Sequence, residues 1–178
     1  METWIALFRG INVGGNNVLP MADLRASLES LKLKNVRTYI QSGNVVFESS
    51  SKKGETIANK IAAVVKREFG FSVQVLVLHA KDFLATMSSN PFAESVADPK
   101  SVHLLFLREA SNSPQIAKID EAKAPSEDYR LTDRVFYLHA PDGIARSKLA
   151  ANVEKYLGVT ATGRNLRTVT KVASMCKS

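Results

Sequence analysis

Two helical hydrophobic patterns alternate with four strand-like stretches in the first 79 residues, and this order limits the folds that the chain can adopt. The series is strand, helix, strand, strand, helix, strand, which is the split βαβ or ferredoxin-like arrangement. In that arrangement the third strand lies between the first and the second in an antiparallel sheet. The strand-like stretches are 4–8, 36–41, 45–47 and 73–78, and the helical patterns are 21–32 and 57–69.

The remaining residues give a similar series that lacks its last strand. A final helix takes the place of that strand. The fold class is therefore α+β, with two fused ferredoxin-like halves, residues 1–79 and 80–178, packed as one compact unit with an extra C-terminal helix. The expected elements are a helix at 80–90, a loop at 94–100, a strand at 102–107, a short helix from 113 or 114 to 119, strands at 127–132 and 135–140, a helix from 148 to 157, and the final helix at 165–176.

Charge and cysteine content restrict the compartment and the partners. Residues 141–178 hold seven Lys/Arg against two Asp/Glu, a net +5 out of +7 for the whole chain. This excess is consistent with an anionic partner such as nucleic acid or a phosphorylated metabolite, and the alternative is a solvated surface that is merely basic. The sequence shows neither a secretory leader nor an apolar run near the ~18 residues of a membrane span. With Cys176 as its single cysteine, the chain is expected in the cytoplasm, without a membrane partner.

A glycine-rich stretch, residues 9–17, follows the first apolar run and precedes the first helical pattern. Glycines permit backbone conformations that other residues disfavour, and they let a ligand approach backbone N–H groups. Together with the nearby positive charge and amide, this arrangement suits an anion. The alternative is a tight connection whose polar groups satisfy one another. The residues assigned to ligand binding in this stretch are Arg9, Gly10, Asn12, Gly14 and Gly15.

The turn between the second and third expected strands should lie beside this glycine-rich stretch, because both occur at the same edge of a ferredoxin-like sheet. Gln41, Ser42 and Asn44 in that turn are candidates for hydrogen bonds to the same ligand. Serine and asparagine also serve turn geometry, which is the alternative interpretation.

Four residues of the second half complete the candidate site: Ser147, Lys148, Arg164 and Asn165. Ser147 and Asn165 stand where helices begin and are expected to cap them. Arg164 precedes a helix N-terminus, where the helix dipole does not favour a cation. A bound anion or an internal carboxylate is therefore expected to compensate its charge.

Motifs for other chemistries are absent from the sequence. The glycine-rich stretch matches neither the P-loop nor the dinucleotide-binding pattern, so no cofactor is expected. His79, His103 and His139 are widely separated and show no metal-ligand spacing, so we expect structural roles and no metal site. No nucleophile can be named, and an RNA-recognition module lacks its aromatic signature at residues 44–48.

Several segments along the chain form a recognisable set: residues 9–15, 38–47, 90–92, 147–149 and 162–165, followed by Thr168 and Val169. Together they resemble the DUF1697 family, a set of small bacterial proteins of unassigned function. The resemblance implies an α+β fold with related ferredoxin-like halves, and it brings no catalytic residues. The sequence differs from the family pattern at Leu166, where an aromatic residue is usual, and at residues 16–19, where a lysine often occurs.

The sequence therefore predicts a protein that binds an anionic, phosphate-bearing ligand where residues 9–15 meet residues 41–44. One alternative is a nucleic-acid-binding module, and a second is a small hydrolase or transferase working at the same loop. A third is a scaffold protein without a small ligand. The nucleic-acid alternative uses the basic residues Arg146, Lys148, Arg164, Arg167 and Lys171.

Overall fold

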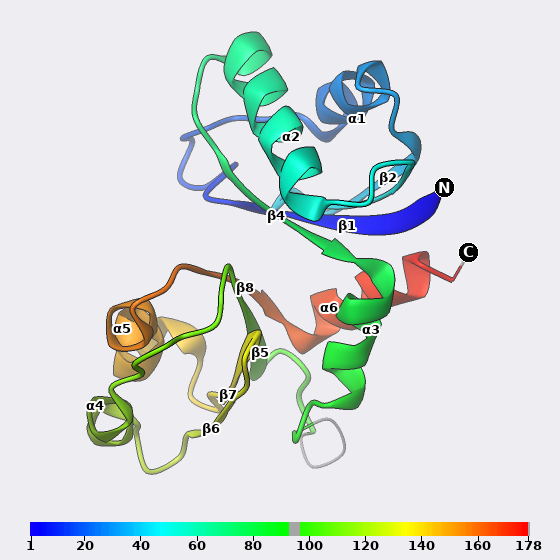
Figure 1. Cartoon of the computed structure of the whole chain (residues 1–178). Coiled ribbons are helices and arrows are strands. Elements are labelled where there is room, and N and C mark those ends of the chain that lie inside the picture. The colour runs from blue at the N-terminus through cyan, green and yellow to red at the C-terminus, as the bar shows by residue number, and fades with distance from the viewer. Residues whose placement is uncertain (93–96, 178) are drawn as a thin grey trace. The chain divides into compact units, whose positions relative to one another are not determined.

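The computed structural model describes residues 1–92 and 97–177 (Figure 1). The chain divides into two compact units, residues 1–85 with 172–178, and residues 86–171. Two helices, α3 (Ala80–Ser88) and α6 (Leu166–Met175), have residues in both units. The expected packing of residues 1–79 and 80–178 as one compact unit stays a prediction. Part of the loop expected at 94–100, residues 94–96, lies outside the described residues.

The first unit has the strand and helix order that the sequence predicts. Its sheet has the strand order β2-β3-β1-β4, so β3 lies between β1 and β2 as expected. All neighbouring strands in this sheet are antiparallel. The elements are β1 (Glu2–Arg9), α1 (Met21–Ser30), β2 (Lys34–Tyr39), β3 (Asn44–Ser49), α2 (Gly54–Phe69) and β4 (Gln74–His79).

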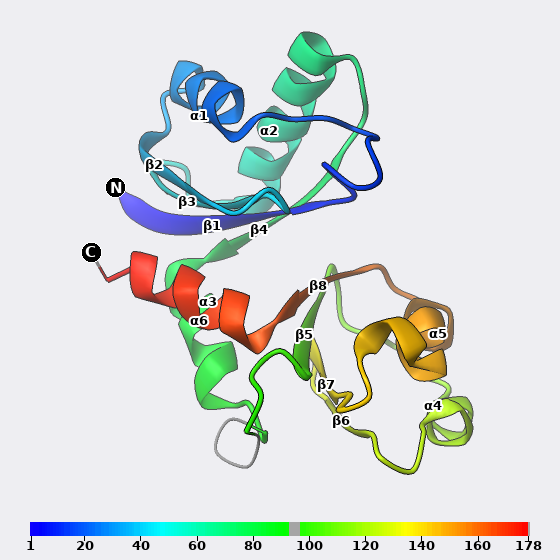
Figure 2. The ribbon, with the colours of Figure 1, turned by 180° about the vertical axis from the view of Figure 1, so that it is seen from behind.

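The two helices of the first unit cover one face of its sheet (Figures 1 and 2). Alternate residues of β1, such as Trp4 and Phe8, pack with the apolar faces of α1 and α2 in one core. Because burying a side chain of this size contributes about 1.5–3 kcal/mol, this core is the main source of stability in the unit. Ile5 and Leu7, on the other face of β1, are also fully buried.

Helix α2 begins in tight contact with the sheet. A side chain at Gly54 would place its Cβ 2.8 Å from the carbonyl oxygen of Val77 and 3.1 Å from Cζ3 of Trp4, so only glycine fits there. The helix ends at Gly70, whose φ of 80° is the left-handed conformation common at helix C-termini. The sequence predicted this stop. Trp4 is buried, with 6% of its surface exposed.

The second unit repeats the same topology. Its sheet has the strand order β6-β7-β5-β8, which matches that of the first sheet when the strands are renumbered from β5. α4 and α5 cover one face, where Ile119 and Leu149 belong to the core. Gly158 ends α5 at a φ of 70°, as expected. The elements are β5 (Val102–Leu107), α4 (Ile116–Ala122), β6 (Asp128–Leu131), β7 (Val135–His139), η1 (Ile144–Arg146), α5 (Lys148–Leu157) and β8 (Ala161–Asn165).

The expectation that the second half lacks its last strand is wrong. β8 pairs antiparallel with β5 from Ala161, opposite Leu107, to Asn165, opposite His103. The segment was missed because it contains Gly163 and polar residues, whose intrinsic preference for strands is low. Pairing with the buried strand β5 overrides that preference. The final helix follows this strand and does not replace it.

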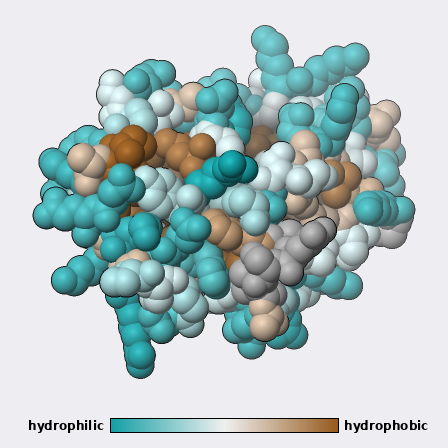
Figure 3. All heavy atoms as spheres, turned by 90° about the horizontal axis from the view of Figure 1, so that it is seen from below, coloured by the Kyte–Doolittle hydropathy of each residue, from teal (hydrophilic) through white to brown (hydrophobic). Residues whose placement is uncertain are grey.

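No helix in the described ranges is long and apolar enough to cross a membrane. On the face shown in Figure 3, apolar side chains form small patches that hydrophilic side chains separate. Such interspersed patches are usual, because apolar atoms contribute more than half of the accessible surface of folded proteins.

Candidate functional site

The glycine-rich loop between β1 and α1 has an unusual backbone. Five of its residues lie in the left-handed region, with φ between 50° and 76°. Glycine and asparagine are the residues that adopt this conformation at least cost, which explains why they dominate the segment. The sequence therefore specifies the loop conformation locally. The five residues are Gly10, Asn12, Gly14, Gly15 and Asn17.

The side chain of Asn12 holds the loop together. Its Nδ2 donates hydrogen bonds to the carbonyl oxygens of Leu19, at 3.0 Å, and Gln41, at 2.8 Å. Its Oδ1 accepts a hydrogen bond of 2.7 Å from the backbone N–H of Leu19. Both amide protons are thus committed within the chain, and the side chain cannot also donate to a ligand without breaking one of these bonds.

The turn between β2 and β3 contacts this loop, as the sequence predicted. The backbone N–H of Phe8 donates a 2.9 Å hydrogen bond to the carbonyl oxygen of Gly43. A Cβ atom at Gly43 would lie only 2.6 Å from Cδ1 of Ile11 and 2.7 Å from Cβ of Phe8. The missing side chain at Gly43 therefore allows the two segments to meet.

Asn44 is fully buried and has a role within the turn. Its Nδ2 donates to the carbonyl oxygen of Tyr39 at 3.0 Å and to Oγ of Ser42 at 3.1 Å. These bonds use both of its amide protons, as in Asn12. Gln41 and Ser42 are exposed at the same turn. The two asparagines among the candidate residues thus stabilise the loop and the turn.

The tip of the glycine-rich loop presents backbone N–H groups to solvent. Gly14 and Gly15 are exposed, and neither N–H donates a hydrogen bond to any residue in the described ranges. Below the tip, the backbone N–H of Asn16 donates to the carbonyl oxygen of Val13 at 2.9 Å, and Nδ2 of Asn17 donates to that of Gly10 at 2.9 Å. The tip is thus held in place by bonds that leave its own donors accessible.

Two candidate residues of the second unit, Ser147 and Asn165, have the capping roles that the sequence predicted. Oγ of Ser147 accepts a 2.9 Å hydrogen bond from the N–H of Ala150 at the start of α5. Oδ1 of Asn165 accepts one of 2.9 Å from the N–H of Thr168 at the start of α6. Lys148 is the exposed first residue of α5.

Arg164 is partly buried in β8. Its Nη1 donates a 2.8 Å hydrogen bond to the carbonyl oxygen of Gly163. Desolvation lowers the pKa of Arg164 to about 10, so the guanidinium remains charged at neutral pH. Arg9 and Arg164 belong to different compact units, and the idea that they act on one ligand stays a prediction.

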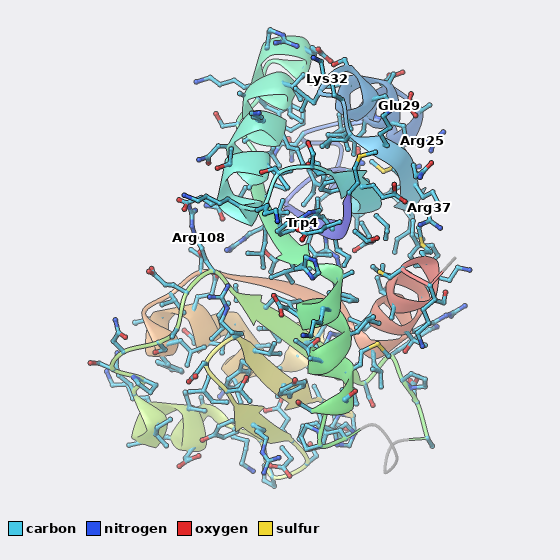
Figure 4. The ribbon with its side chains drawn as sticks, turned by 45° about the vertical axis from the view of Figure 1, so that its right-hand side comes forward. Trp4, Arg25, Glu29, Lys32, Arg37 and Arg108 are labelled. Atoms are coloured by element: carbon cyan, nitrogen blue, oxygen red, sulfur yellow. The ribbon has the colours of Figure 1, made fainter. Side chains whose placement is uncertain are left out.

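Two hollows in the first unit were missed by the sequence interpretation. An open hollow of about 540 Å³ is lined by Glu29, Arg37 and Glu48 with residues 35 and 36. Figure 4 labels Glu29 and Arg37 beside Arg25, whose Nη1 donates a 2.7 Å hydrogen bond to Oγ1 of Thr38. The available signal was a group of basic residues at 32, 34 and 37, preceded by Glu29 and followed by Glu48.

The other hollow, of about 320 Å³, lies where α1, the 49–51 connector and α2 meet. The run of three serines followed by two lysines and glycine before α2 was the sequence signal for it. Two lysines contribute to its wall. The lining residues are Leu31, Lys32, Leu33, Ser49, Ser50, Ser51, Thr56, Ile57 and Lys60.

The histidines make local contacts. The ring of His79 packs edge-on against Trp4 with ring centres 5.1 Å apart, and its Nδ1 accepts a 3.2 Å hydrogen bond from the N–H of Lys81. His139 packs against Phe92 at 5.8 Å. Desolvation lowers the pKa of His103. Within residues 1–92 and 97–177, no group of three or more His, Cys, Asp or Glu gathers to hold a metal.

Comparison with known proteins shows which protein family the chain belongs to. The model of the family described as "Protein of unknown function (DUF1697)" matches residues 1–137. The chain therefore belongs to the DUF1697 family. Among solved structures, it is similar to a conserved bacterial protein, SP0830, from Streptococcus pneumoniae. The two are 28% identical, with a TM-score of 0.75 over 98% of each chain. No curated protein matches the sequence at a significant level.

Proposed function

We propose that this protein binds an anionic, phosphate-bearing ligand at the tip of the glycine-rich loop. One observation carries the proposal: Gly14 and Gly15 are exposed residues, and neither N–H group makes a hydrogen bond within the described part of the chain. Successive backbone N–H groups in a turn conformation are a common means of binding phosphate oxygens.

The loop is preorganised for this role. Asn12 connects it to Leu19 and to the Gln41 carbonyl, while Asn17 connects it to the Gly10 carbonyl. A ligand therefore meets a conformation that already exists, and little conformational entropy is lost on binding. In this proposal Asn12 and Asn44 support the site without touching the ligand, which revises the direct contacts expected from the sequence.

The local charge also supports an anion. Residues 3–22 and 30–47, which include the loop and the neighbouring turn, contain no Asp or Glu, while Arg9 stands directly before the loop. An anion approaching the tip thus meets a nearby cation and no carboxylate from these two segments, so its approach is electrostatically favourable. Gln41 and Ser42 are the exposed polar residues of the turn and the second group of proposed contacts.

The proposal places this activity in the cytoplasm, where phosphorylated metabolites and nucleotides are abundant and Cys176 would stay reduced. The second-unit residues Ser147, Lys148, Arg164 and Asn165 remain secondary candidates. Two of them, Ser147 and Asn165, cap helices of their own unit.

Thermal denaturation with phosphate, sugar phosphates, nucleotides and short oligonucleotides tests the proposal. A ligand at ~100 times its dissociation constant adds about 2.7 kcal/mol to the free energy of unfolding. The Gly14→Val variant should lose this gain, because a β-branched residue cannot adopt the φ of 56° without strain and the tip must change. No atom lies closer than 4.0 Å to the added Cβ, so the variant should still fold.

Gly70→Val is the matched control. Gly70 has a φ of 80°, a Cβ there meets nothing within 4 Å, and it ends α2 in the same unit. This variant should lose similar stability yet keep the ligand-induced gain. An equal ligand-induced gain in stability in the wild type, Gly14→Val and Gly70→Val would overturn the proposed loop site. A gain only with oligonucleotides, kept in Gly14→Val and abolished by added salt, would instead favour the nucleic-acid alternative with its basic residues after 145.

A further inference from the structure

Exposed aliphatic residues occur along the glycine-rich loop and in the adjoining turn. Among the large hydrophobic residues that are exposed in residues 1–92 and 97–177, three occupy this loop and the adjoining turn. Val13 is 64% exposed, Val18 is 60% exposed and Ile40 is 48% exposed. Single exposed aliphatic residues need no explanation, but three beside one proposed site raise the question of what they contact.

The hydrogen bonds of the loop place these three residues at one edge of the unit. Val13 follows Asn12, whose side chain bonds to the carbonyl oxygen of Gln41, the residue after Ile40. The backbone N–H of Asn12 donates to the carbonyl oxygen of Asn17, the residue before Val18, at 3.1 Å. Each aliphatic residue is thus next in sequence to a member of the same network, and two of them flank the glycine tip.

Ile40 also has an unusual backbone conformation. Its φ is 49°, in the left-handed region, which is a genuine outlier for a β-branched residue. Glycine or asparagine would adopt this conformation at lower cost, and an exposed isoleucine gains little from burial in return. Strained backbone of this kind clusters at functional sites, where the surrounding structure holds it in place.

We infer that the ligand is an amphiphilic phosphate, a phosphate ester whose organic group is aliphatic. This inference rests on the proposed function of the loop. The N–H groups of Gly14 and Gly15 bind the phosphate, while Val13, Val18 and Ile40 contact the aliphatic group beside it. Removing that group and the three side chains from water together favours binding over that of phosphate alone.

Isothermal titration calorimetry with inorganic phosphate, hexyl phosphate and hexanol tests the inference. The protein should bind hexyl phosphate at least about tenfold more tightly than inorganic phosphate, a ratio equal to about 1.4 kcal/mol. Hexanol, which lacks the phosphate group, should bind far more weakly than hexyl phosphate and than inorganic phosphate.

The Val13→Ser, Val18→Ser, Ile40→Asn triple variant should bind hexyl phosphate and inorganic phosphate equally well. It should remain folded, because all three side chains are exposed and asparagine tolerates the left-handed conformation at position 40. Ile116→Asn is the control, since Ile116 is 41% exposed on α4 of the other unit. This control should keep the preference for hexyl phosphate.

The outcomes separate the two proposals. Equal affinity for phosphate and hexyl phosphate in the wild type would overturn the amphiphilic ligand and leave the phosphate site standing. Binding of neither would overturn both, and hexanol binding as tight as hexyl phosphate would also overturn the inference. Cosedimentation with vesicles of phosphatidic acid in phosphatidylcholine then shows whether the phosphate ester belongs to a lipid or to a soluble molecule. Binding to vesicles indicates a lipid headgroup, and binding to hexyl phosphate alone indicates a soluble ester.

Discussion

The side-chain amide of Asn12 donates a 2.8 Å hydrogen bond to the carbonyl oxygen of Gln41, 29 residues further along the chain. With a second bond to the carbonyl oxygen of Leu19, this amide connects the glycine-rich loop to the β2–β3 turn. The loop conformation therefore depends on one asparagine whose two amide protons both have acceptors within the protein.

The Asn12→Asp substitution tests this dependence. Aspartate has the same shape and tolerates the left-handed conformation, but it leaves two carbonyl oxygens without their donor. A hydrogen bond whose freed partner can reach water contributes about 0.5–1.5 kcal/mol, and a partner left buried costs about 1–3 kcal/mol, so the free energy of unfolding should fall by about 1–3 kcal/mol in urea denaturation. Asn16→Asp is the control, since Asn16 is exposed in the same loop. A similar loss in both variants would contradict the role given to Asn12.

Gly43 and Gly14 allow the effect of a steric clash to be separated from that of backbone strain. Both have positive φ, 75° and 56°, so alanine at either position should cost about 1 kcal/mol. Only at Gly43 does the added Cβ meet other atoms, Ile11 and Phe8 at under 3 Å. Gly43→Ala should therefore lose a further 1–3 kcal/mol or so, which comparison of urea midpoints would reveal.

Tyr129 should ionise unusually late. Its burial, its 2.7 Å hydrogen bond to Asp120 and the charge of that carboxylate raise its pKa to about 12. Because the folded pKa exceeds the unfolded value of 10, this tyrosine stabilises the fold at lower pH, and that contribution is lost as pH rises from 10 through 12. Absorbance titration at 295 nm should show a late component that is smaller in Tyr129→Phe; buried Tyr137, whose pKa desolvation also raises, supplies the remainder. An unchanged curve would contradict the assignment.

His103 should make the stability depend on pH below neutrality. Desolvation holds its pKa below the ordinary 6.5, so the unfolded chain binds a proton more readily than the folded protein. The contribution of His103 to the free energy of unfolding is therefore fully present above about pH 6.5. It is lost as pH falls through the folded pKa, by at most about 1.4 kcal/mol per pH unit. His103→Gln should flatten the dependence between pH 6.5 and 5, as measured by urea denaturation. Equal slopes in the two proteins would disprove it.

Much of the fold could be predicted because local patterns and tertiary structure agree. Leu24 and Leu28 repeat at helical spacing and are both buried, and Gly70 and Gly158 end their helices in the expected conformation. β8 could not be predicted in this way, because its residues have low strand preference and only the pairing with β5 makes it a strand.

The proximity of the glycine-rich loop and the β2–β3 turn could also be predicted, but the roles of the individual residues there could not. The meeting of the glycine-rich loop and the turn follows from strand order alone. By contrast, the hydrogen bonds of Asn12 and Asn44 depend on distances to particular carbonyl groups, which no spacing in the sequence specifies. Exposed Val13 and Ile40 were missed because aliphatic residues near strand ends are normally expected in the core.

Trp4 is the only tryptophan in the sequence, and it lies buried in the first unit, where the start of α2 packs against it. Its emission should therefore follow the opening of that unit, whereas far-ultraviolet circular dichroism follows the helices of both. Coincident denaturation curves would mean that the halves unfold in one step, and an earlier emission change would mean that the first unit opens alone. A single buried indole thus lets ordinary fluorescence separate the folding of one half from that of the whole chain.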